Sequence, residues 1–337
     1  MSLFMTRART LRPTLAGLAL LLALAASAGC APTLVPQDPK LPPGFVETAL
    51  PEADMGGYAY LSQTTPLTIP LEWFVPKESL PPGAPVQAGV DRIAVWLGPT
   101  DIESFGVLVD FVSAAEASFA EAQVEAQARG TLRVQRANDE LLAFQGSGQW
   151  TDALRNAAGS NVKRKFSERY TEQWELLRLL PASPPGDPVA AGFLKVNSQL
   201  LDSLAAKGGM NLGNVAPALG AVQIGDIAFI AYANAPVTLP ARVTPAYLRE
   251  TTVGALFVVR STYPGVLVNF FLNNFADRAG LEKGPQVQGQ EVLYRNFQDV
   301  HLMLKAVGNT LFFSLAPTKE KAEALMASAL APHVKGG

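Results

Sequence analysis

The sequence has very few of the residues on which metal sites and many catalytic sites depend. Among its 337 residues there are two histidines, His301 and His333, and one cysteine, Cys30. A structural zinc site takes four cysteine or histidine ligands, so these residues are too few to build one. A single cysteine has no partner for an intramolecular disulfide, and the fold must therefore be stabilised by packing.

The sequence also lacks a surplus of positive charge and the glycine motifs of nucleotide-binding proteins. Its 27 Lys and Arg residues are balanced by 29 Asp and Glu residues, which disfavours binding to nucleic-acid phosphates. Gly208, Gly209 and Gly213 lack both the GxGxxG spacing and the Lys-Ser/Thr of a phosphate loop, and we interpret them as a turn. We expect no cofactor and no metal, and we favour a non-enzymatic role.

The two histidines have ordinary sequence surroundings. His301 alternates with apolar residues in an expected strand, so we interpret it as structural rather than as a member of a catalytic triad. His333 falls in the C-terminal tail, residues 331–337, which we expect to be frayed.

The first 30 residues have the order of an export signal. Arg7, Arg9 and Arg12 precede an apolar run over residues 15–26, and small residues follow it. A positive start, an apolar centre of about a dozen residues and a small-residue end are typical of a secretory signal peptide. We therefore assign residues 1–29 to a signal peptide.

Cys30 follows Ala28 and Gly29 at the point where that peptide would be cut. This segment resembles the lipobox of bacterial lipoproteins, although Ser27 stands where the family usually has Leu. The resemblance implies a lipidated Cys30 that holds the chain on the extracytoplasmic face of a membrane of the cell envelope. Two alternatives stay open: cleavage after Ala28, which leaves a free Cys30, and an uncleaved anchor over residues 15–28.

Residues 30–55 are rich in proline and poor in regular patterning. Six prolines lie between residues 31 and 52. Because proline favours an extended chain, we predict a semi-rigid tether between the membrane and the domain. The alternative is an arm packed on the fold.

A short motif occurs twice, 170 positions apart. Residues 58–70 read YAYLSQTTPLTIP and residues 228–240 read AFIAYANAPVTLP, so Pro-apolar-Thr-apolar-Pro recurs around Thr68 and Thr238. The match predicts a duplication with repeat one over 56–159 and repeat two over 226–330. Each repeat should contain a strand, a strand, a helix, a hairpin and a helix.

The repeats can be aligned element by element. In repeat one we expect strands at 58–62 and 92–98, a helix at 105–128, a hairpin at 131–137 and 140–145, and a helix at 150–158. In repeat two the equivalents are a strand at 256–260, a helix at 264–279, a hairpin at 301–307 and 310–315, and a helix at 319–330, with an extra strand at 290–297. The alignment is direct over GVLVDF at 106–111 and GVLVNF at 265–270, so both should lie in helices with matching buried positions.

Residues 160–225 have no counterpart and predict a central helical insert. Phe166, Tyr170, Trp174 and Leu177 recur at helical spacing and should form one buried face. A second helix should begin after Asp187. The expected fold class is therefore α+β, with an antiparallel-rich sheet and helices packed on one of its faces.

The connection between residues 64 and 91 is the candidate binding site. It contains six prolines, Trp73 and Phe74, and the matching connection in repeat two carries Tyr247. Long connections within compact domains tend to carry function. We predict a non-enzymatic lipoprotein that binds a protein partner or a small ligand through this loop. The alternative functions are a carrier of an apolar ligand such as a lipid and a hydrolase of unrecognised type. The alternative role for Trp73 and Phe74 is that they only cover a sheet edge.

Overall fold

The structure is a computed structural model in which twelve antiparallel strands form one sheet and six helices pack on it, counting the described residues only. The coarse prediction of an α+β fold with an antiparallel sheet is therefore confirmed. Cys30, Trp73 and Phe74 lie outside the described residues. Those residues are 34–48, 50–52, 54–70, 87–101, 103–127, 132–146, 149–157, 165–196, 199, 224–239, 246–247, 250, 252–276, 280–297 and 300–334.

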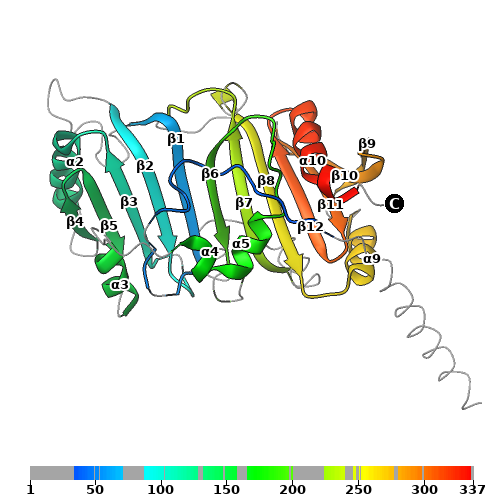
Figure 1. Ribbon diagram of the computed structural model, residues 1–337, viewed down its shortest axis with the longest axis horizontal. Coiled ribbons are helices and arrows are strands. Elements are labelled where there is room, and N and C mark those ends of the chain that lie inside the picture. Colours follow the sequence, from blue (N-terminus) through cyan, green and yellow to red (C-terminus); the bar gives the residue numbers. More distant parts are fainter. Residues whose placement is uncertain are drawn as a thin grey trace, which may run out of the picture.

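The strands run across the sheet in the order β4-β5-β3-β2-β1-β6-β7-β8-β12-β11-β10-β9 (Figure 1). The strands begin and end along two opposite margins of the sheet. We call the margin at which β1 and β7 end the upper edge, and the margin at which β1 begins and β8 ends the lower edge, as they lie in Figure 1. Along the chain the strands are β1 (Gly57–Pro70), β2 (Gln87–Leu97), β3 (Phe105–Phe111), β4 (Arg133–Ala137), β5 (Glu140–Gln145), β6 (Asp187–Leu194), β7 (Ile224–Ala233), β8 (Thr252–Ser261), β9 (Glu282–Val287), β10 (Gln290–Phe297), β11 (Val300–Val307) and β12 (Thr310–Ala316).

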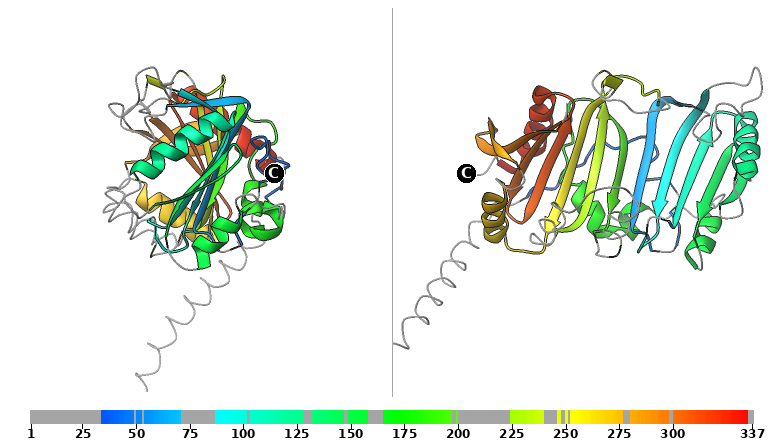
Figure 2. Two further views of the ribbon diagram at one scale, coloured as in Figure 1. Left: turned by 90° about the vertical axis from the view of Figure 1, so that its left-hand side faces the viewer. Right: turned by 180° about the vertical axis from the view of Figure 1, so that it is seen from behind.

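Helices lie on both faces of this sheet, so the prediction that they share one face is wrong. Helices α4, α5 and α10 lie on what we call the first face, and α2 and α9 lie on the second face (Figure 2). The reason is that both strand faces are apolar, and each needs a cover. The helices are α2 (Ala114–Gln127), α3 (Gln149–Ala157), α4 (Phe166–Arg169), α5 (Thr171–Leu177), α9 (Gly265–Phe275) and α10 (Lys319–Val334).

The largest core cluster lies on the first face. Strand alternation brings Tyr58, Tyr60 and Trp96 to this face, where each is at most 2% exposed. Burying a large apolar side chain contributes about 1.5–3 kcal/mol, so this cluster dominates the packing energy. The face predicted for the central insert is confirmed as core, since Phe166, Tyr170 and Leu177 are all buried.

Residues 187–194 of the insert form a strand, so the helix predicted to begin after Asp187 is wrong over these residues. Residues 187–194 form β6, which pairs with β1 on one side and β7 on the other. A Cβ atom at Gly192 would lie 2.0 Å from the carbonyl oxygen of Tyr58, so only glycine allows this pairing. The insert thus supplies the central strand that joins the two halves of the sheet.

The proline-rich segment is packed on the sheet along residues 34–48, which we call the N-terminal arm. Phe45 is 1% exposed, and its ring contacts the rings of Tyr58 and Tyr60. The Tyr60 hydroxyl donates a hydrogen bond of 2.9 Å to the carbonyl oxygen of Pro43. The prediction of a free tether is wrong for this part, and the packed alternative holds.

The aligned hexapeptides adopt different structures, so their predicted equivalence is wrong. GVLVDF lies in β3, between β2 and β5, and the following helix α2 begins only after Ser113. GVLVNF lies in α9, where Val266 is 45% and Phe270 58% exposed. A shared helix with matching buried positions is therefore excluded here.

Several other elements agree with the sequence prediction. The hairpins appear as β4–β5 and β11–β12, and the extra strand appears as β10 over Gln290–Phe297. Thr318 caps α10, because its hydroxyl accepts a hydrogen bond of 3.3 Å from the amide of Lys321. The first connection is shorter than predicted, since β1 continues to Pro70 and β2 begins at Gln87.

Candidate functional site

The two copies of the repeated motif touch each other at the upper edge of the sheet. Thr68 and Thr238 form a parallel bridge, and the amide of Leu239 donates a hydrogen bond of 2.7 Å to the carbonyl oxygen of Thr68. The Gln63 side chain accepts from the Val237 amide at 2.7 Å and donates to the Val237 carbonyl at 3.3 Å. We call this contact the motif junction.

The motif junction fixes where the two candidate binding segments start. The segment with Trp73 begins just after Pro70, and the segment with Tyr247 begins just after Leu239, which packs in the same apolar cluster as Leu67. Tyr247 is half-buried against that cluster. The structure therefore places Tyr247 against the apolar cluster that contains Leu67, while Trp73 and Phe74 fall outside the described residues.

A polar cleft of about 640 Å³ lies at the lower edge, between the end of the proline-rich segment, α4–α5, the end of β6 and the start of β7. Lys195 forms an ion pair with Asp54 at 2.7 Å, and Gln173 donates a hydrogen bond to Asp226. The described lining consists of Glu52, Asp54, Arg169, Tyr170, Thr171, Glu172, Gln173, Lys195 and Asp226.

Two groups in this cleft have shifted pKa values. Burial raises the pKa of Tyr170 to about 12, and the nearby Arg169 charge offsets part of this effect. The Nζ of Lys195 lies 5.5 Å and the Cζ of Arg169 lies 5.6 Å from the centre of the Tyr170 ring, in the range of cation–π contacts. Burial also raises the pKa of Asp226, and the Gln173 hydrogen bond opposes that shift.

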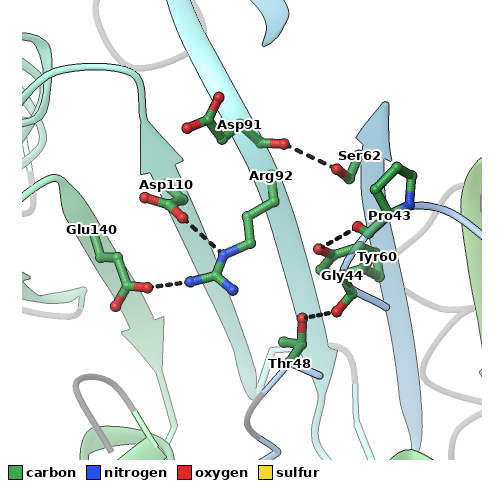
Figure 3. Close-up of polar contacts among 9 residues, drawn as sticks. All are labelled: Pro43, Gly44, Thr48, Tyr60, Ser62, Asp91, Arg92, Asp110 and Glu140. Carbon is green, nitrogen blue, oxygen red and sulfur yellow. Dashed lines mark hydrogen bonds and ion pairs between the residues drawn. The ribbon is translucent and has the colours of Figure 1, made fainter. Parts of the chain in front are cut away.

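A charged ladder crosses the first face of the first half of the sheet (Figure 3). Arg92 of β2 pairs with Asp110 of β3 at 2.9 Å and with Glu140 of β5. Burial raises the pKa of Asp110, and the Arg92 guanidinium lowers it in part. Because two carboxylates already neutralise the guanidinium, this ladder ties three strands together and is a structural feature.

The histidines take part in packing. His301 of β11 accepts or donates a hydrogen bond of 2.7 Å with the Tyr294 hydroxyl and stacks on the Tyr294 ring. His333 is 6% exposed in α10, so the prediction of a frayed tail is wrong at this residue. Its Nδ1 accepts a hydrogen bond of 3.1 Å from the Val35 amide, and its Nε2 lies 3.1 Å from the Leu179 carbonyl oxygen. His333 thereby holds the start of the N-terminal arm.

The described residues show neither a metal-binding cluster nor a membrane-spanning helix. Across these ranges, no three His, Cys, Asp or Glu side chains are grouped closely enough to hold a metal ion. Every helix in the described part of the chain is too short or too polar to span a bilayer.

Sequence reasoning missed the cleft and the charged ladder. The ladder had a local signal, because Asp110 interrupts an apolar run and Arg92 begins another. The cleft had none, since its lining comes from four separate stretches of sequence that only the fold brings together.

The comparisons with known proteins give little beyond this geometry. No family model matches the chain, and no curated protein matches it. The chain is similar to a solved structure described as "Structure of crystal form I of TP0453", with 9% sequence identity and a TM-score of 0.33. That match covers 86% of this chain and 97% of the other.

Proposed function

We propose that this chain is a bacterial lipoprotein that binds a ligand or a protein partner without catalysing a reaction. In this proposal the signal peptide over 1–29 is removed and a lipid on Cys30 holds the chain on the extracytoplasmic face of an envelope membrane. The supporting observation is the packed N-terminal arm. Since His333 fixes Val35 only five residues after Cys30, a lipid there would hold the folded sheet close to the membrane.

The anchor can be tested by labelling cells that produce the protein with a palmitate analogue. The wild-type chain should carry the label and partition into the detergent phase, whereas Cys30→Ala should lose both properties or accumulate as precursor. An unlabelled wild-type chain in the aqueous phase would exclude the anchor.

The binding role is supported by the motif junction. It brings the starts of the two candidate segments together at the upper edge, and half-buried Tyr247 packs against the same apolar cluster as Leu239. The hexapeptides at 106–111 and 265–270 do not support the predicted duplication, because they adopt different structures. We propose a duplication only for the repeated motifs around Thr68 and Thr238, which contact each other.

The aromatic pair Trp73 and Phe74 provides the test of this binding site. An aromatic anchor contributes to an interface only if it is free to meet a partner. We expect a loss of under about 1 kcal/mol in the free energy of unfolding for at least one of Trp73→Ala and Phe74→Ala, as is usual for surface changes. Losses above about 3 kcal/mol for both would place the pair in the core and remove the proposed site.

One observation favours the apolar carrier as a second candidate. Ile227, Phe229 and Phe257 are only partly buried on the second face, and the two phenylalanine rings lie 5.9 Å apart. A fluorescent fatty acid would then bind the wild-type chain, and Phe229→Ser would weaken that binding. Equal binding by both chains would argue against a ligand on this face.

The hydrolase alternative depends on the polar cleft, where burial raises the pKa of Asp226. A hydrolase of this kind would lose turnover in Asp226→Asn. A screen of ester, amide and glycoside substrates in which the wild-type chain and Asp226→Asn are equally inactive would favour the binding role.

A further inference from the structure

The exposed apolar side chains are distributed unevenly over the molecule. The described residues include four large apolar side chains that are exposed: Val35 at 44%, Val112 at 49%, Val266 at 45% and Phe270 at 58%. Val266 and Phe270 lie in α9, which packs on the second half of the sheet. Val35 lies in the N-terminal arm, where the arm contacts His333 of α10 in the same half. Val112 follows β3 in the first half.

The exposed side of helix α9 carries no charge and combines the apolar side chains of Val266 and Phe270 with asparagines. Its eleven residues include no acidic residue in the first turn and no basic residue in the last, and its sequence GVLVNFFLNNF has no charged residue at all. Val266 and Phe270 are four residues apart and share one side, while Val268 is fully buried against the sheet. The Asn269 and Asn274 side chains donate hydrogen bonds to carbonyls of the same helix, at 3.0 Å and 2.7 Å.

The start of α9 contacts the β11–β12 hairpin directly, and the start of the N-terminal arm is linked to the same hairpin through His333 of α10. A Cβ atom on Gly265 would lie 2.6 Å from the backbone of Gly308 in the hairpin turn. On the other face of the sheet, the His333 ring that holds Val35 lies 5.2 Å from the Phe312 ring. Phe312 is four residues from Gly308, which is about 13 Å along a strand.

The sequence ties Cys30 to the start of the arm by a short stretch of chain. Cys30 stands five positions before Val35, and a fully extended chain of that length spans at most about 18 Å. Val112 lies elsewhere, because six strand spacings of about 4.8 Å separate β3 from β12 and its strand ends at the upper edge. Val35 and the Val266–Phe270 pair are therefore the exposed apolar side chains that a lipid on Cys30 would bring to the membrane, and of these only the α9 pair forms a surface of two large side chains.

We propose that the Val266–Phe270 side of α9 enters the surface of the lipid bilayer that holds Cys30, so that the lower edge at α9 faces the membrane. This inference rests on the proposed lipid anchor. A further apolar contact adds to the membrane binding that a lipid anchor provides, in proportion to the apolar area that it buries. Tyr263 stacks on Phe271 at 5.7 Å beside this surface, and tyrosine suits the boundary between lipid and water.

A lipid surface fits α9 better than a protein partner does. Protein interfaces usually combine apolar contacts with hydrogen bonds and charges at the rim. Of the three exposed asparagines of the helix, Asn269 and Asn274 already donate within it, and the helix offers no charge for a partner to pair with. The contact should accordingly be insensitive to the charge of the lipid headgroups.

The test uses the full lipidated chain in phosphatidylcholine vesicles with a fluorescent thiol label on Val266→Cys. Because a lipidated Cys30 has no free thiol, each chain should take one label. The matched control is the same label on Val112→Cys, a side chain of similar exposure in the other half. Quenching by lipids that carry a nitroxide on the acyl chain reports contact with the bilayer.

We expect several-fold stronger quenching at position 266 than at position 112, with no change when phosphatidylglycerol is added. Phe270→Asp in the Val266→Cys chain should reduce quenching to the level of the control, and its thermal midpoint should stay near that of the parent because Phe270 is exposed. Equal quenching at both positions in singly labelled chains would overturn the α9 contact and leave the anchor standing. Two labels per chain would show a free Cys30, and the anchor and this inference would then fail together.

Discussion

GVLVDF at 106–111 and GVLVNF at 265–270 differ at one position, yet the first is a strand and the second a helix. In β3 the alternation of strands buries Leu108 on one face and Phe111 on the other, between two neighbouring strands. In α9 helical spacing buries Val268 and leaves Phe270 outside. The same apolar residues can therefore form a strand or a helix, and the surrounding structure determines which of the two they form, because intrinsic propensity is weak and tertiary contacts override it.

The flanking residues explain each choice. Ser113 ends the strand, since its hydroxyl accepts a hydrogen bond from the Glu116 amide at 3.3 Å and donates one to the Glu116 carboxylate at 3.1 Å. This capping box starts α2 after the hexapeptide instead of within it. Before the second hexapeptide, Pro264 takes an extended conformation and leads directly into α9.

The largest expected difference lies in the final phenylalanine of each hexapeptide. Phe111 is 0% exposed, so Phe111→Ala should reduce the free energy of unfolding by about 3–5 kcal/mol. Phe270 is 58% exposed, and Phe270→Ala should cost under about 1 kcal/mol. Urea unfolding of both variants provides the measurement. Similar losses in the two variants would mean that the hexapeptides are packed alike.

Exchanging the one residue that differs tests the role of the charged ladder. Asp110→Asn removes the charge that pairs with Arg92 at 2.9 Å, and we expect a loss of about 1.5–3 kcal/mol, the range for hydrogen bonds to charged groups. The reverse exchange, Asn269→Asp, lies on the exposed side of α9 and should change stability by less than about 0.5 kcal/mol. Thermal unfolding of the pair decides the point, and an equal cost for both exchanges would contradict it.

The helix starts should also respond differently. Ser113→Ala removes the cap of α2 and should cost about 1 kcal/mol in unfolding free energy. Pro264 makes no side-chain cap on α9, so Pro264→Ala should stay within about 0.5 kcal/mol of wild type. If Ser113→Ala has no effect, the capping box does not explain where β3 ends.

The smallest effect concerns the arm, which crosses from the first half of the sheet to the second. Burial lowers the pKa of His333, and the Leu179 carbonyl opposes this shift. The stability from neutral His333 is therefore full above the unfolded pKa of about 6.5 and is lost as the pH falls from there through the lowered folded value. His333→Gln keeps an acceptor and a donor without titrating. Its unfolding midpoint should fall less than that of wild type between neutral and acidic pH, and an equal fall would contradict the assignment.

The sequence predicted local elements better than their partners in the sheet. Hairpin turns at Asn138 and Gly308 and the cap at Thr318 could be predicted because each signal lies within a few residues. β6 could not, because Asp187 and Pro188 also suit a helix start, and only pairing with β1 and β7 makes this segment a strand.

The candidate site was predictable only in outline. The repeated motif gave the positions of Thr68 and Thr238 but not their contact, which depends on the strand between them. The packing of the arm could not be predicted either. The proline content of residues 30–55 indicated an extended tether, whereas the arm is held on the sheet by contacts such as that between the rings of Phe45 and Tyr60. Contacts of this kind form across the sheet and leave no periodic pattern in the sequence.

The most direct test of the central claim is the intact mass of the mature chain purified from a bacterial host. The account predicts a chain that begins at Cys30 and carries the added mass of a lipid on that residue. An unmodified chain that begins at Gly29 would contradict it.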